Sequence, residues 1–139
     1  MQPVRLSTFL TLTTVAVAIA GGALSAQDLR APGPYTSEQA ELGRAGFERN
    51  CQGCHMPELA GGRRAPALKG AEFMEHWSGR PAKDLYWKVR STMPPTGGVL
   101  DEPGYFGVVA YILQSNSVPA GTEPLTAESI VPIVPVPPQ

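Results

Sequence analysis

The sequence predicts an all-α fold with one packed domain. Four segments carry helix signals or helical apolar spacing, and no segment alternates apolar and polar residues as strands do. With 139 residues, of which 42% are hydrophobic, the chain is long enough for one core and too short for two ordinary domains. Fifteen glycines and fifteen prolines predict long irregular connections between the helices. Because only 7% of the residues are aromatic, the core could need mass beyond its own side chains.

The N-terminal residues 1–26 have the pattern of a secretory signal peptide. Arg5 precedes an uncharged run that includes the apolar stretch from Phe9 to Ala20, and small residues follow. The alternative is an uncleaved membrane anchor, for which this stretch is barely long enough and which its threonines weaken. We therefore expect export of the chain, with residues 27–35 as a short lead of the mature protein.

The first helix is expected over residues 37–50. Thr36 or Ser37 has the position of an N-cap, and Gln39, three residues after Thr36, completes a capping-box pattern. Gly43, Phe47 and Cys51 recur at four-residue intervals, which places them on one face of the helix. The helix therefore brings a thiol to the core.

The middle of the chain is expected to be mostly irregular. Residues 55–70 contain two prolines and three glycines and predict a loop. Short helices are expected over residues 71–77 and 82–90, where apolar residues recur. The prolines and glycines of residues 93–98 then exclude regular structure.

The last helix is expected over residues 102–114, with a broad apolar face that packs on the first helix. In this prediction Gly43 allows a close approach to the ring of Tyr111. The folded domain thus covers residues 36–116. Residues 117–139 are rich in proline and are expected to form an extended tail that lies over the domain or is free.

The charge balance excludes one class of partner. The formal net charge is −1, and removal of a leader that contains only Arg5 as a charge leaves ten basic and twelve acidic side chains. Binding to nucleic acid requires a clustered basic excess, so nucleic acid is not expected as a partner.

The pentapeptide from Cys51 to His55 reads C-x-x-C-H, the signature of covalent haem attachment. Two thiols at this spacing can add to the two vinyl groups of one porphyrin. The imidazole of the next residue then lies under the iron. The motif predicts one haem c, attached through Cys51 and Cys54, with His55 as an axial ligand.

Three other interpretations of the two cysteines were weighed. A thioredoxin-like dithiol normally accompanies a βαβ pattern, which the sequence lacks. A zinc site of Cys51, Cys54, His55 and His76 would lack the usual second pair of spaced ligands. A local disulfide would leave the adjacent histidine unexplained.

These features together resemble those of class I cytochromes c of the bacterial periplasmic kind. The resemblance covers roughly residues 36–116. It implies a fold in which the N-terminal and C-terminal helices cross beside the haem, and a periplasmic location. The Pro-rich tail is also similar to that of haem domains associated with quinoprotein or alcohol dehydrogenases. The segments that carry the resemblance are Gly43, Phe47, residues 51–55, residues 65–68, Met93 with Pro94, and residues 109–113.

The second axial ligand is expected to be Met93. Met56 adjoins the histidine and cannot reach the opposite haem face, whereas Met74 and His76 fall in a short helix, as a packed methionine and a surface histidine. Met93 precedes two prolines, so its backbone is extended and stiff. The ligand methionine of the family has the same Met-Pro setting. His76 or an open sixth position remain as alternatives.

The resemblance also implies supporting residues. The carbonyl of Pro66 would accept a hydrogen bond from the second imidazole nitrogen of His55. The indole N–H of Trp77 would meet a haem propionate, although plain core packing explains this residue nearly as well.

Other residues near the haem were assigned from their chemistry. Arg63 and Arg64 could pair with propionates, or could simply be solvated. Tyr86 and Trp87 could line the haem crevice, or could simply pack in the core.

The predicted function is electron transfer by a monomeric periplasmic carrier, not catalysis. With His and Met on its two faces, the iron has no vacant position for a substrate. The expected partners are redox proteins: a dehydrogenase as donor and an oxidase or another cytochrome as acceptor. The membrane would be a partner only if the leader is uncleaved. The alternatives are a haem subunit docked permanently in a larger oxidoreductase, and a ligand-binding or peroxidase-like protein if Met93 does not bind iron.

Overall fold

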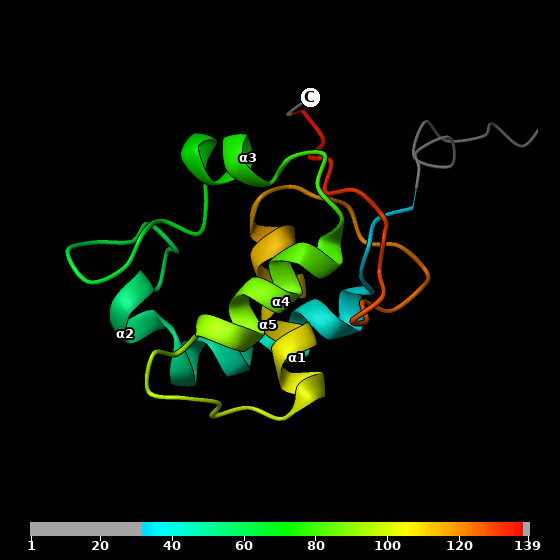
Figure 1. Ribbon diagram of the computed structural model, residues 1–139. Helices are drawn as coiled ribbons and strands as arrows, with labels where there is room; N and C mark the ends of the chain where they lie inside the picture. The colour runs from blue at the N-terminus through cyan, green and yellow to red at the C-terminus, as the bar shows by residue number, and fades with distance from the viewer. Residues whose placement is uncertain (1–31, 138–139) are drawn as a thin grey trace, which may run out of the picture. The chain divides into compact units, whose positions relative to one another are not determined.

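The part of the chain that the structure describes folds into five helices, and the all-α prediction is confirmed (Figure 1). The computed structural model describes residues 32–137, so the predicted leader and most of the lead lie outside the described residues. Within the described range, β structure is limited to two isolated bridges. No helix among these residues combines the length and hydropathy needed to span a bilayer. The helices are α1 (Ser37–Asn50), α2 (Gln52–His55), α3 (Ala71–Trp77), α4 (Ala82–Thr92) and α5 (Glu102–Ser115).

The helix boundaries follow from local sequence signals. Helix α1 begins where the Thr36 side chain accepts a hydrogen bond from the Gln39 backbone N–H and the Gln39 side chain accepts one from the Thr36 N–H. Helix α5 begins after Asp101, the N-cap, whose side chain accepts a hydrogen bond from the Gly104 N–H. Helix α4 runs two residues beyond its predicted end and stops at Met93, since a proline follows.

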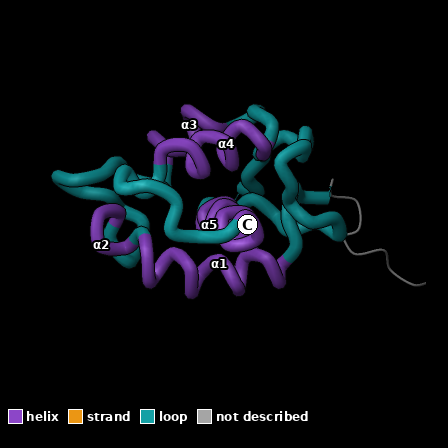
Figure 2. The backbone as a smooth tube through the Cα atoms, turned by 60° about the horizontal axis from the view of Figure 1, so that its bottom comes forward, coloured by secondary structure: helices purple, strands orange, loops and turns teal. Residues whose placement is uncertain are grey.

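Helices α1 and α5 cross at two glycines. In Figure 2 α1 runs across the view while α5 is seen nearly end-on, and the two helices make the most extensive contact between elements. A Cβ on Gly43 would lie 1.8 Å from the carbonyl oxygen of Gly107, so the two backbones are in direct contact. The prediction that Gly43 faces Tyr111 is therefore wrong. The ring of Tyr111 lies against Phe47 instead, with 5.4 Å between the ring centroids.

The C-terminal tail, residues 117–137, is extended and lies over the domain. Two backbone hydrogen bonds of 2.9 Å join Ile133 to the segment between α3 and α4: its carbonyl accepts from the Gly79 N–H, and its N–H donates to the Arg80 carbonyl. The Ala82 N–H donates to Val131 at 3.0 Å. The Ile133 side chain is fully buried in the core. The tail therefore belongs to the folded unit, although its sequence has no periodic pattern.

Ile133 is expected to be a large contributor to the stability that the tail supplies. The substitution Ile133→Ala should lower the free energy of unfolding by about 2–4 kcal/mol, because it leaves a cavity in the core. Ile130, which is 71% exposed in the same tail, provides the control, and Ile130→Ala should change the value by less than about 0.5 kcal/mol. Denaturant unfolding of the holoprotein measures both. Equal effects of the two variants would show that the tail does not pack as described.

Candidate functional site

The C-x-x-C-H motif forms a tight turn directly after α1. Cys51 is the C-cap of α1, and its N–H donates to the Phe47 carbonyl at 2.8 Å. Its own carbonyl accepts from the N–H groups of Cys54 at 3.2 Å and His55 at 3.0 Å, which begins the short helix α2. Cys51 is half-buried and Cys54 is exposed. The backbone thus presents both thiols and the imidazole within a single turn.

His55 is buried and held by a backbone carbonyl. Its Nδ1 lies 2.9 Å from the carbonyl oxygen of Pro66, which can only accept, so Nδ1 carries the proton. Nε2 therefore keeps its lone pair, as a metal ligand requires. The contact that the resemblance implied between His55 and Pro66 is present in the structure.

A close backbone contact places Pro66 beside His55. Gly61 has φ of 69°, and a Cβ there would lie 2.4 Å from the carbonyl carbon of Pro66. The Gly61 N–H also donates to the His55 carbonyl at 2.9 Å. Only glycine fits this position, because a side chain would push the Pro66 segment away from the imidazole.

Burial changes the acidity of one thiol. It raises the pKa of Cys51 to about 11, and the neighbouring Cys54 adds to the effect. Cys51 therefore stays protonated at neutral pH. A dithiol that exchanges disulfides works through a thiolate of lowered pKa, so this environment does not favour the thioredoxin-like interpretation.

The motif opens into a mainly apolar cavity of about 670 Å³. This volume lies within the range of cofactor pockets, and each of the five helices contributes to its walls. The cavity brings together Cys51, Cys54, His55, Pro66, Trp77, Arg64 and Met93, which are the site residues that the sequence predicted, along with apolar residues that include Phe47, Leu68, Phe73, Leu85, Val89, Val108 and Ile112.

Of the candidate sulfur ligands, Met93 alone lines the cavity. It follows the last residue of α4 with extended backbone angles of φ −127° and ψ 137°. Met56 is exposed, and Met74 packs against the hydrophobic core. The structure thus places Met93 and His55 on one cavity.

Tyr86 and Trp87 do not lie where the sequence suggested, at the haem crevice. Trp87 is 53% exposed, and its indole N–H donates to the Ala127 carbonyl of the tail at 3.2 Å. Tyr86 is buried, and its hydroxyl donates to Glu102 at 3.1 Å. Neither residue lines the cavity, so the suggestion that they line the crevice is wrong. On α4 the residues that line it are Leu85, Lys88, Val89 and Thr92.

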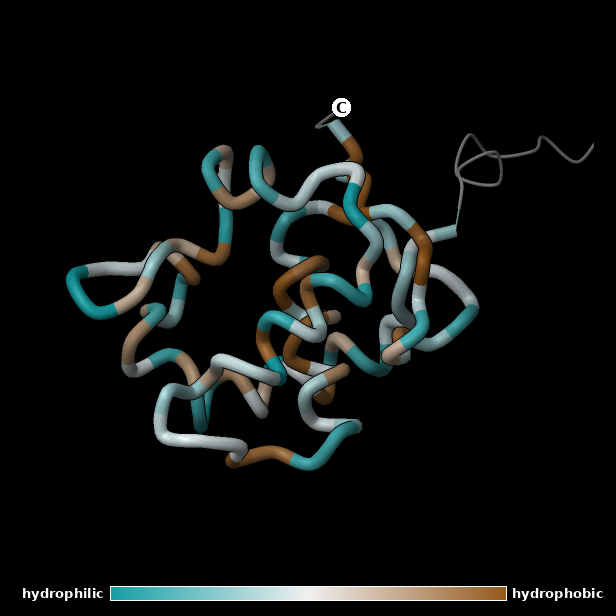
Figure 3. The backbone as a smooth tube through the Cα atoms, viewed as in Figure 1, coloured by the Kyte–Doolittle hydropathy of each residue, from teal (hydrophilic) through white to brown (hydrophobic). Residues whose placement is uncertain are grey.

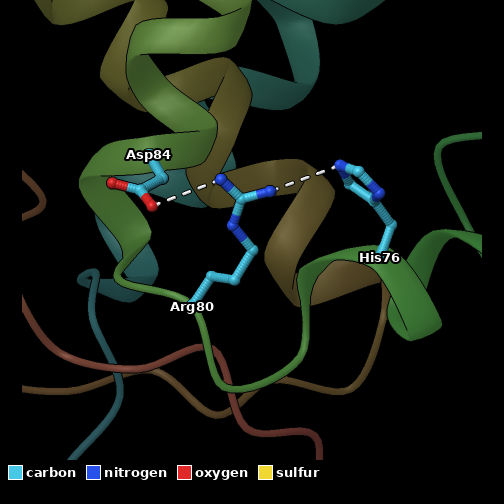
Figure 4. Close-up of polar contacts among 3 residues, drawn as sticks. All are labelled: His76, Arg80 and Asp84. Carbon is cyan, nitrogen blue, oxygen red and sulfur yellow. Dashed lines mark hydrogen bonds and ion pairs between the residues drawn. The ribbon is translucent and has the colours of Figure 1, made fainter.

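His76 lies at the rim of the cavity and is exposed. Its Nε2 is 3.3 Å from Nη1 of Arg80, whose other terminal nitrogen is 3.4 Å from the Asp84 carboxylate (Figure 4). Because the guanidinium can only donate, Nε2 accepts in this contact. The same guanidinium lies over the ring of Trp77, 4.7 Å from its centroid. His76 is therefore engaged in a surface network.

Asn116 supports the cavity wall and was not among the predicted site residues. This buried side chain donates to the carbonyl of Leu68 at 2.8 Å and accepts from the Gly70 N–H at 3.0 Å. It also donates to Ile112 at 2.8 Å. It thereby joins the end of α5 to the loop that carries Pro66. An asparagine just after an apolar helix was the only signal in the sequence, and it indicates a helix end without naming a partner.

The zinc interpretation finds no support in this arrangement. Across residues 32–137, no three His, Cys, Asp or Glu side chains form a group that could hold a metal ion. The set of Cys51, Cys54, His55 and His76 is therefore not assembled as a tetrahedral site.

The site fits a covalent haem in its chemistry. Two thiols lie beside an imidazole with a free Nε2, in an apolar cavity that the protein's own side chains leave open. The family model described as cytochrome c oxidase, cbb3-type, subunit III matches residues 38–112. No curated protein and no solved structure matches the chain. Since the matched residues make up more than half of the sequence, the protein belongs to this family of c-type cytochromes, with haem c attached through Cys51 and Cys54.

Proposed function

We propose that the protein is a monomeric periplasmic electron carrier whose iron is bound by His55 and Met93. As a c-type cytochrome it transfers electrons, and its partners are redox proteins. When bound, the haem supplies a one-electron couple between ferric and ferrous iron. The observation that carries the ligand assignment is that His55, with its free Nε2, and Met93 line the same cavity. With both axial positions filled, electron transfer is possible and substrate binding at the iron is not.

The residues around the iron favour a stable electron-transfer site. The Pro66 carbonyl fixes the imidazole ring of His55 and strengthens its donation to iron. A thioether ligand favours the ferrous state and raises the reduction potential. The mainly apolar walls of the cavity would reduce the contact of a bound haem with water, which favours the less charged state of the centre.

The signal-like residues 1–26 support export, and a dehydrogenase donor with an oxidase or cytochrome acceptor fits a periplasmic carrier. A second candidate is a haem subunit docked in a larger oxidoreductase. It is favoured by the family description, which names an oxidase subunit. The two functions differ in what purifies with the protein from its native membrane and periplasmic fractions: a carrier elutes alone, and a subunit elutes with its complex.

The proposed ligation is tested by visible spectra of the purified holoprotein in both redox states. We expect c-type haem bands and, in the ferric form, the weak long-wavelength band that reports sulfur on iron. A mass equal to that of the bare polypeptide would overturn haem attachment. A high-spin ferric spectrum would overturn ligation by Met93 and favour a ligand-binding protein instead.

The loop of residues 56–70 gives the protein a local positive charge. It projects from the helices in Figures 1 and 2, and its tip is hydrophilic in Figure 3. The loop has three basic residues and one acidic residue, whereas the other described residues include six basic and ten acidic ones. Arg63 and Arg64 are exposed at a tight turn that the Gly62–Ala65 bridge closes, and they line a surface hollow together with Cys54. This charge favours a partner with an acidic face at the haem edge.

Charge reversal in this loop should slow electron transfer to an anionic oxidant. The double variant Arg63→Glu/Arg64→Glu is expected to react about fivefold more slowly with hexacyanoferrate(III) at low ionic strength, because the local field changes sign. Its reaction with the cationic oxidant tris(phenanthroline)cobalt(III) should become faster. Stopped-flow oxidation of the ferrous protein measures both rates.

The control has the same change in net charge at other sites. In the variant Arg44→Glu/Lys83→Glu, both substitutions lie on helices outside the loop. If this variant slows the reaction with hexacyanoferrate(III) as much as the loop variant does, net charge alone governs the rate, and the loop has no special role.

A further inference from the structure

We propose that Tyr105 is a positioning residue that holds the backbone of Met93, and that its hydroxyl controls how readily the sulfur leaves the iron. The inference rests on the proposed ligation by Met93. The Tyr105 hydroxyl donates to the Met93 carbonyl oxygen at 3.0 Å. Tyr105 lies in the first turns of α5, twelve residues after Met93, so the hydrogen bond ties the Met93 segment to a different helix.

The Met93 backbone is held from two sides. Its N–H donates to the Val89 carbonyl at 2.9 Å, which continues the hydrogen-bond pattern of α4. Its carbonyl accepts from Tyr105 on α5. Because both polar groups of Met93 are fixed by helices, few positions are open to its side chain. The position from which the Met93 side chain reaches the cavity is therefore held by α4 and α5.

Beyond Met93 the chain has little support of its own. Residues 94–100 contain no helix, and the hydrogen bond from the Gly97 N–H to the Pro94 carbonyl is local to the loop. This loop is mostly exposed. Loss of the Tyr105 hydrogen bond would therefore release the start of the loop from α5, and the Met93 N–H bond to α4 would be left to hold it.

Tyr105 itself is firmly placed. Its side chain is 1% exposed, and its backbone N–H donates to Asp101 at 3.1 Å. The Arg90 guanidinium lies over its ring, 5.0 Å from the centroid. The ring is thus fixed by contacts that do not involve the hydroxyl, so removal of the hydroxyl alone should leave the ring in place.

The chain offers a matched control in Tyr86. Its ring is equally buried, but its hydroxyl donates to Glu102 and not to Met93. Tyr105→Phe and Tyr86→Phe therefore remove the same group from similar surroundings. The first variant alone removes a hydrogen bond to the ligand segment.

The test is the rate at which imidazole binds to the ferric holoprotein, because imidazole must displace the sulfur. Tyr105→Phe should raise this rate about fivefold, which corresponds to about 1 kcal/mol at 1.4 kcal/mol per tenfold. It should also weaken the sulfur-to-iron band. Tyr86→Phe should leave the rate and the band near their wild-type values.

Three outcomes are decisive. If the wild-type protein shows the sulfur band and the two variants bind imidazole at equal rates, the role of Tyr105 is overturned and the proposed ligation stands. A wild-type spectrum without the band would overturn the ligation and, with it, this inference. If Tyr105→Phe is less stable overall, amide hydrogen exchange decides: faster exchange confined to residues 93–98 supports the proposal, and exchange that rises uniformly across the protein overturns it.

Discussion

Replacing Gly43 by alanine is expected to destabilise the holoprotein by about 3 kcal/mol or more, a large effect for one methyl group. The added Cβ would lie 1.8 Å from the Gly107 carbonyl oxygen and 2.1 Å from its carbon. Both atoms belong to the backbone of α5, so the clash can be relieved only if the two helices move apart. Alanine normally stabilises a helix by about 1 kcal/mol relative to glycine, and the clash has to exceed that gain.

The control for this experiment lies one turn away on the same helix. A Cβ on Gly46 would lie 3.2 Å from a side-chain methyl of Val108, which can shift by a small amount. The free energy of unfolding of Gly46→Ala is therefore expected to stay within about 1 kcal/mol of the wild-type value. Thermal and denaturant unfolding of both variants give the comparison. Similar stabilities for the two would contradict the backbone contact between α1 and α5.

Replacing Met93 by leucine is expected to remove the sulfur ligand and to lower the reduction potential strongly. Leucine has nearly the same volume, so the cavity stays filled while the thioether is lost. Axial ligands set haem potentials over a range of roughly 0.8 V, and we expect the shift to be a substantial part of that range. The ferric spectrum should lose its long-wavelength sulfur band, and the ferric protein should become able to bind small external ligands. Potentiometric titration and visible spectroscopy measure these effects.

Met74→Leu is the matched control, because Met74 packs against the core and does not line the cavity. It should keep both the band and the potential. If Met93→Leu also kept them, the sixth ligand would be another residue. His76 at the cavity rim would be the next candidate. His76→Ala would then remove the sixth ligand and change the spectrum and the potential that Met93→Leu had left unchanged.

Much of the helical framework could be predicted because its signals are local. The capping box at Thr36 and the apolar spacing after it correctly predicted the bounds of α1, and the prolines after Met93 correctly predicted a break. The C-x-x-C-H spacing correctly indicated a c-type cytochrome, since the chemistry of attachment lies within five consecutive residues.

The parts that could not be predicted depend on contacts between distant segments. Helical spacing cannot decide whether Gly43 meets Gly107 or Tyr111, because both residues lie on α5 and the choice depends on how the helices cross. Leu85, Lys88, Val89 and Thr92 share the cavity face of α4 at helical spacing, which places Trp87 away from the cavity. Its hydrogen-bond partner, the Ala127 carbonyl of the tail, is distant in the sequence and could not be predicted. The tail itself has no periodic pattern that could reveal its buried isoleucine.

The order of these segments along the chain determines the order in which they become available to form the haem site. The two thiols precede most of the residues that enclose the cavity, the last of which is Ile112. A polypeptide that emerges from its N-terminus would thus present Cys51 and Cys54 before α5 could close over them. Haem attachment would then take place on an unfolded segment, and Ile133, which follows α5 in the chain, would enter the core later.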